Sequence, residues 1–140
     1  MDIFSHAIAG AAAGAIFQLP GTGAFFGVLP DLVLGLKRVA TPPARYKLTH
    51  SFLFILVLPA LLALADAQIA KCAAVALASH LILDLPTHGP VWAPRLLYPF
   101  SEKIFVDSSE WEWGNKSWTT GFLLTLNWSV VCLTITFARL

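Results

Sequence analysis

Four histidines and two aspartates are the residues of this sequence whose types and positions could do chemistry. They are His6, His50, His80, His88, Asp31 and Asp84. Each lies beside or within an apolar run, where an ionisable side chain is expensive and by default marks a function. Imidazole and carboxylate without thiolate are ligands that suit Zn²⁺, with Mn²⁺ and Fe²⁺ as alternatives. The residue types therefore predict a divalent metal site, with zinc as the expected ion.

His80 and Asp84 are four residues apart in an apolar stretch that we expect to be helical. At this spacing both side chains project from one helix face, about 6 Å apart along the axis. The pair suits two ligands of one metal ion, or ligands of two adjacent ions. The alternative is a hydrogen bond between imidazole and carboxylate that seals a buried helix contact.

The other ligand candidates favour the metal interpretation. A helical hairpin that turns at Asp66 would bring His50 to the same end as His80 and Asp84. Asp31 reaches that end too, because it directly precedes the connection that leads into His50. Three separate segments thus deliver ligands to one face of the membrane. We predict metal binding by Asp31, His50, His80 and Asp84, with a purely structural polar network as the alternative.

His6 and His88 are candidates for assisting roles in catalysis. His6 joins the site, as a further metal ligand, only if the two short apolar stretches before residue 37 fold back on each other. His88 lies in a rigid turn, where a metal ligand, a general acid for the leaving group and a plain turn residue are equal alternatives. Thr87 could position a water molecule or orient Asp84 as a hydroxyl donor. Thr49 is explained most simply as the N-cap of the following helix.

Hydrolysis is the economical use of such a site. A bound Zn²⁺ lowers the pKa of its water to about 7 and so supplies hydroxide at neutral pH. We expect an ester or phosphoester substrate, in a membrane lipid or another amphiphile, because the site would lie where headgroups are. The competing class is a membrane protein that binds or transports a metal ion or proton, for which Asp66 and Asn127 are the further polar residues.

Composition indicates the solvent in which these residues lie. Of the 140 residues 57% are hydrophobic and 12% are charged, about half of the ~25% charged content of ordinary soluble domains. Nine basic and eight acidic residues leave a net charge of +1, which excludes the basic field of a nucleic-acid-binding protein. We therefore expect a single all-α integral membrane domain over 1–140, with the bilayer as a partner and no nucleic acid.

Apolar stretches bounded by proline, glycine or charged residues predict the helices. We expect them at 3–17, 24–36, 51–65, 69–85 and 118–138, as a short N-terminal hairpin, a central helical hairpin and a C-terminal transmembrane helix. Leu19 to Gly23 is predicted as a turn, and Gly10 and Gly14 have the spacing that allows close helix approach.

The polar connections predict the orientation in the membrane. The stretch 86–117 carries tryptophans among charges, which is typical of an interfacial region. Arg95 within it could clamp a phosphate or carboxylate, or simply extend toward water. Positive charge on Lys37, Arg38, Arg45 and Lys47 predicts that this connection is cytoplasmic and that the C-terminus lies outside.

An ordered set of short motifs resembles a known family. The motifs are His6-Ala7 with Gly10, Leu29-Pro30-Asp31, Leu48-Thr49-His50-Ser51, His80-Leu81-Ile82-Leu83-Asp84 with Thr87 and Gly89, and Leu97-Tyr98-Pro99-Phe100. Over residues 2–103 the sequence is similar to the YdjM-like family of bacterial inner-membrane proteins, described as metal-dependent hydrolases. The resemblance implies a multi-pass protein of the bacterial inner membrane with hydrolase activity.

The order of histidines and aspartates is also distantly similar to zinc phospholipase C and the related single-strand nucleases. That similarity implies that Asp31, His50, His80 and Asp84 hold one zinc and that His6 and Asp84 contribute to a second. His88 stands where the third site of that group begins. Because no histidine follows residue 88, a three-metal centre is not expected.

Overall fold

The computed structural model describes residues 2–35, 41–106 and 116–139, and within them the chain is helical without strands. The helices are α1 (Ile3–Ala15), α2 (Pro20–Leu32), α3 (Ala44–Thr49), α4 (Phe52–Leu62), α5 (Ala67–Asp84) and α6 (Lys116–Phe137). The prediction of an all-α fold with two hairpins and a C-terminal helix is confirmed. Helix α3 was not predicted, because six residues are too few to show a helical period.

Helices α1 and α2 form the N-terminal hairpin. Asp2 begins α1, where its carboxylate accepts hydrogen bonds from the Ser5 amide at 2.9 Å and the Ser5 hydroxyl at 2.6 Å. The chain reverses at Gln18, which has a φ of 61°. Helix α2 then begins at Pro20, so the prediction that Leu19 to Gly23 is only a turn was wrong. Proline fits the first helical turn because that position needs no amide donor.

Four glycines bring the backbones of the two helices into contact. Gly10 and Gly14 of α1 face Gly23 and Gly27 of α2, as the spacing on α1 predicted. A methyl group at Gly10 would lie 2.8 Å from the Cα of Gly27, and one at Gly14 would lie 2.8 Å from the Cα of Gly23. Such contacts are too short for any side chain, so glycine fixes how closely α1 and α2 pack.

The central hairpin consists of α4 and α5, both begun by a side-chain cap. Ser51 is the N-cap of α4 and accepts from the amide of Phe54 at 3.5 Å, so the assignment of this role to Thr49 was wrong. Asp66 caps α5 by accepting from the amides of Gln68 and Ile69 at 2.7 and 3.0 Å.

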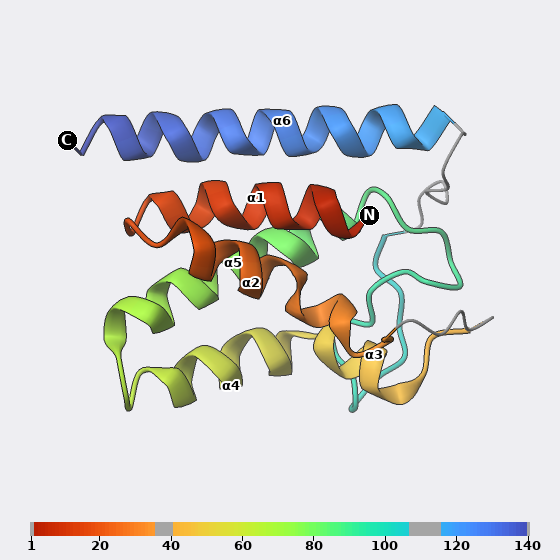
Figure 1. Cartoon of the computed structure of the whole chain (residues 1–140). Coiled ribbons are helices and arrows are strands. Elements are labelled where there is room, and N and C mark those ends of the chain that lie inside the picture. Colours follow the sequence, from red (N-terminus) through yellow and green to blue (C-terminus); the bar gives the residue numbers. More distant parts are fainter. Residues whose placement is uncertain (1, 36–40, 107–115, 140) are drawn as a thin grey trace.

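Helices α1 and α5 lie at the centre of the molecule, and the longer helices pack against them (Figure 1). Helix α6 runs along α1, on the side away from α4, while α2 and α4 pack against α5. The core between α2 and α5 contains Phe26, Ala73, Ala76 and Leu77, with apolar side chains of α4 packed around them. Helices α1 and α6 begin at the same end of the molecule. The start of α1 and the end of α6 therefore lie at opposite ends of its long axis.

The surface agrees with a membrane environment. Among the described residues, α5 and the stretch Thr119–Phe137 of α6 are long and apolar enough to cross a bilayer. Large apolar side chains are exposed along α4 and α6, including Leu56, Leu61, Leu126 and Val130. Exposed apolar side chains gathered on helices in this way are typical of surfaces that contact lipid or another protein.

The connection that follows α5 is irregular from Leu85 to Val106 and is tied to α4 by a hydrogen bond from the Phe52 amide to the Leu96 carbonyl at 2.9 Å. Its interfacial position stays a prediction, as does the single domain over 1–140. Some residues on which the interface and orientation predictions rested lie outside the described residues. They are Lys37, Arg38, Trp111 and Trp113.

Candidate metal centre

The ends of four helices deliver the predicted ligands to one place. His6 comes from the first turns of α1, Asp31 from the last turn of α2, His50 from the end of α3, and His80 and Asp84 from the last turns of α5. In Figure 1 these helix ends meet on the side where the N-terminus lies. The fold-back of α1 on α2, on which the inclusion of His6 depended, is present.

One group of atoms surrounds Oδ2 of Asp84. The Nε2 atoms of His50 and His80 lie 3.4 and 3.1 Å from this oxygen. The two Nε2 atoms are 3.0 Å apart. Oδ1 of Asp31 completes the group at 3.4 Å from Nε2 of His50.

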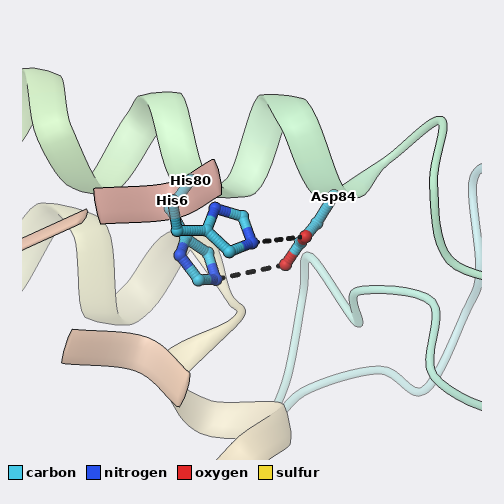
Figure 2. Close-up of side chains that lie close together, drawn as sticks. All are labelled: His6, His80 and Asp84. Carbon is cyan, nitrogen blue, oxygen red and sulfur yellow. Dashed lines mark hydrogen bonds and ion pairs between the residues drawn. The ribbon is translucent and has the colours of Figure 1, made fainter. Parts of the chain in front are cut away.

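A second group surrounds the other carboxylate oxygen of Asp84. Nε2 of His6 lies 2.9 Å from Oδ1 of Asp84, and Nδ1 of His88 lies 3.3 Å from the same atom. Figure 2 shows His6 and His80 directed at the two different oxygens. Asp84 therefore lies between the two groups, with one oxygen for each.

Backbone carbonyls fix the proton positions of two histidines. Nδ1 of His80 donates to the carbonyl of Gly27 at 2.7 Å, and Nδ1 of His50 donates to the carbonyl of Tyr46 at 2.9 Å. A carbonyl can only accept, so the neutral rings carry their proton on Nδ1 and present a lone pair at Nε2. Carbonyls behind metal-ligating histidines commonly set the ring in this way.

Aromatic stacking holds the rings in place. His6 stacks on His80 with centroids 3.6 Å apart, and Tyr46 stacks on His50 at 3.7 Å. Trp92 packs edge-on against Tyr46 at 5.1 Å. Sequence reasoning missed Tyr46, although its position four residues before His50 allows the carbonyl contact if this stretch is helical.

These atoms satisfy the first requirement of a metal site, which is proximity. Ligand atoms of His6, His80 and Asp84 lie within 4.8 Å of one another, and so do those of Asp31, His50 and His80. The side chains of His6, His50 and Asp84 are fully buried, whereas Asp31 and His88 are 18% and 16% exposed. The cluster is therefore reached from the edge formed by Asp31 and His88.

Two threonines support the cluster through the backbone. The Thr49 hydroxyl donates to the carbonyls of Pro30 and Tyr46, both at 3.0 Å, and so ties α3 to the end of α2 that carries Asp31. The Thr87 hydroxyl donates to the Leu83 carbonyl at 2.9 Å. Thr87 thus stabilises the end of α5, rather than donating to the Asp84 carboxylate as one interpretation proposed.

Replacement of Thr49 by valine should lower the free energy of unfolding by about 1 to 3 kcal/mol, because it removes the hydroxyl that donates to the Pro30 carbonyl. Thr49→Ser retains the hydroxyl and should recover most of the loss. Unfolding of both variants in detergent micelles, followed by circular dichroism, measures the difference. Equal stability of the two variants would show that the hydroxyl does not tie the helices together.

Charged residues of the adjoining connection are engaged with the protein itself. Arg95 donates to the carbonyls of Ala93 and Pro90 at 2.7 and 3.1 Å, so its guanidinium organises the loop. Lys47 donates to both carboxylate oxygens of Glu102 at 2.8 and 2.9 Å, and this hydrogen bond lowers the pKa of Glu102. The anion clamp proposed for Arg95 has no support in these contacts.

The fold and the cluster together define a helical membrane protein with a buried site of histidines and aspartates at one end of its helices. The chain belongs to the YdjM inner membrane protein family, whose sequence model matches residues 1–139. The expected family is thereby confirmed. No curated protein and no solved structure matches the chain.

Proposed function

We propose that this protein is a metal-dependent hydrolase that cleaves an ester or phosphoester of a lipid-like substrate. The proposal rests on one observation, the distance of 3.0 Å between Nε2 of His50 and Nε2 of His80. When both rings are neutral with the proton on Nδ1, both atoms present lone pairs, and Asp84 adds a carboxylate oxygen beside them. Acceptors that converge in a buried place repel one another unless a proton or a metal cation lies among them, and this donor set suits a metal cation.

The donor set fits a divalent ion with nitrogen and oxygen ligands. Asp31, His50, His80 and Asp84 would hold it, and zinc is the ion that two imidazoles and carboxylates suit best, with manganese or iron as alternatives. His6 and the other oxygen of Asp84 form the natural place for a second ion. A divalent ion bound here supplies a Lewis acid and activates water for attack at neutral pH.

The chain's own residues would bind and orient the reactants. Gly27 and Tyr46 hold the neutral imidazoles in the tautomer that offers Nε2 to a cation. His88 is the cluster histidine that a substrate can reach, at the exposed edge beside Asp84. We assign to His88 the role of the general acid that protonates the leaving group. We assign to His6 the role of holding the Asp84 carboxylate in place.

Transport of a metal or proton is the less favoured function. It requires polar side chains that continue from the cluster across the membrane. Asp66 and Asn127 were the residues that could do this, but Asp66 caps α5 and the Asn127 amide donates to the Leu123 carbonyl on its own helix. Both side chains are exposed and make local contacts.

Removal and return of metal test the proposed function. Purified protein in phospholipid nanodiscs should hydrolyse a component of a mixed bacterial lipid extract, as detected by mass spectrometry of the products. Chelation should lower the rate by more than about 100-fold, since loss of a mere supporting residue of a metal site already costs 10- to 100-fold. Addition of Zn²⁺ or Mn²⁺ should restore it. Undiminished turnover in metal-free protein would contradict the proposal.

A further inference from the structure

The packing of α6 provides a measure of how deep the cluster lies in the bilayer. Ala9 of α1 and Leu83 of α5 pack with Leu124 and Trp128 of α6. One turn further along α1, Ala12 and Ala13 pack with Cys132. Helices α1 and α6 therefore run in the same direction, as Figure 1 shows, and Leu83 lies near the level of Leu124.

The charge-free part of α6 gives the expected membrane boundary. Lys116 is followed by 22 residues without a charge, from 117 to 138, which correspond to about 33 Å of helix and match a hydrocarbon core of about 30 Å. Leu124 is eight residues beyond Lys116, or about 12 Å. Asp84 adjoins Leu83, and His6 is three residues before Ala9, so the cluster lies about 8 to 12 Å beyond the point where α6 enters the membrane.

Helices α1, α2 and α4 are shorter than a membrane span, unlike α5 and α6. Helices α1 and α2 have 13 residues each and α4 has 11, which correspond to about 20 and 16 Å. At the end opposite the cluster, Asp66 and Lys71 are exposed and polar. Three of the helices around the site are therefore shorter than the bilayer that α6 would span.

Several exposed side chains that adjoin the cluster residues in the sequence are apolar, beside the charged pair of Lys47 and Glu102. Leu32, which follows Asp31, is 47% exposed, and Val91, three residues after His88, is 43% exposed. Leu48, two residues before His50, is also exposed. An edge that opened only to water would not be expected to expose these large apolar side chains.

We infer that the cluster is recessed into the hydrocarbon layer and receives a membrane lipid whose scissile bond is brought to the level of the acyl chains. The substrate part of this inference rests on the proposed hydrolase function, whereas the depth does not. A water-soluble ester would have to pass exposed apolar side chains to reach Asp31 and His88. A lipid already has its apolar part at that depth, and thinning of the bilayer around the short helices lowers its headgroup toward the cluster.

Spin-label depth measurements test the inference without metal or substrate. Ile82 lies between His80 and Asp84 on α5 and is 52% exposed, so a label on Ile82→Cys reports the level of the cluster. Leu123→Cys and Thr119→Cys on α6 serve as deep and shallow references at exposed positions. The native cysteines are buried. Circular dichroism checks that each variant keeps the helical fold.

In vesicles of phosphatidylcholine, the Ile82 label should be accessible to oxygen and shielded from a polar nickel reagent. Its depth should agree with that of Leu123 to within about 3 Å, the rise of two helical residues. Nickel accessibility equal to that at Thr119 would overturn the inference and leave the hydrolase proposal intact. A recessed label in a protein that hydrolyses nothing would contradict the hydrolase proposal and preserve the depth.

Discussion

Asp84→Asn should abolish zinc binding while leaving the chain folded. Asp84 offers one oxygen to His50 and His80 and the other to His6 and His88, so its replacement weakens both groups at once. Loss of a supporting residue of a metal site costs 10- to 100-fold in affinity, and loss of a carboxylate shared by two groups should exceed about 100-fold. Isothermal titration with Zn²⁺ and elemental analysis of the purified variant measure the effect.

Asp66→Asn is the matched control for this prediction. Asp66 lies at the opposite end of the same helix and caps it, and asparagine is an equally good N-cap. The control should bind zinc like the original protein and retain its stability. If Asp84→Asn bound zinc with unchanged affinity, the cluster would be a polar network and the proposed hydrolase would lose its basis.

Gly23→Ala should destabilise the protein by about 3 kcal/mol or more, at or above the upper end of the usual cost of overpacking. A methyl group at Gly23 would overlap the Gly10 carbonyl oxygen and lie 2.6 Å from the Cα of Gly14. Both obstacles are backbone atoms, so no side-chain rotation can relieve the contact. Helix α1 would have to move away from α2, and His6 would move with it from Asp84.

Gly21→Ala isolates this effect from helix propensity. Gly21 lies in the same helix, two residues earlier, and a methyl group there would meet nothing within 4 Å. The control should be neutral or more stable by up to about 1 kcal/mol, because alanine favours the helix over glycine. Unfolding of both variants in micelles measures the difference. Equal stabilities would mean that the two backbones are not in contact.

The fold was predictable where the sequence carries a long, local pattern. The apolar stretches of α5 and α6 and the turn at Asp66 were placed within a few residues. Short elements were not: α3 was missed, and α2 begins at Pro20 instead of residue 24. A proline that starts a helix and a proline that ends one look alike in sequence until the following residues have a partner to pack against.

The candidate site was likewise predictable in part. Its residue types, the spacing of His80 and Asp84, and the meeting of Asp31 and His50 with them could be predicted from the order of the segments. Tyr46 was missed and Thr49 was given the wrong role, because their contacts involve backbone carbonyls. Every residue has a backbone carbonyl, so the sequence does not indicate which carbonyls accept hydrogen bonds from the residues of the site.

The sequence by itself determined that imidazoles and carboxylates lie in a charge-poor, helical chain and that two of them share one helix face. Only the tertiary structure decided that His6 belongs to the cluster, that the two oxygens of Asp84 face different histidines, and which ring nitrogens point inward. The first properties follow from composition and helical periodicity, which are local. The others depend on the contact of glycine backbones between α1 and α2 and on the packing of α5, which join residues far apart in the chain.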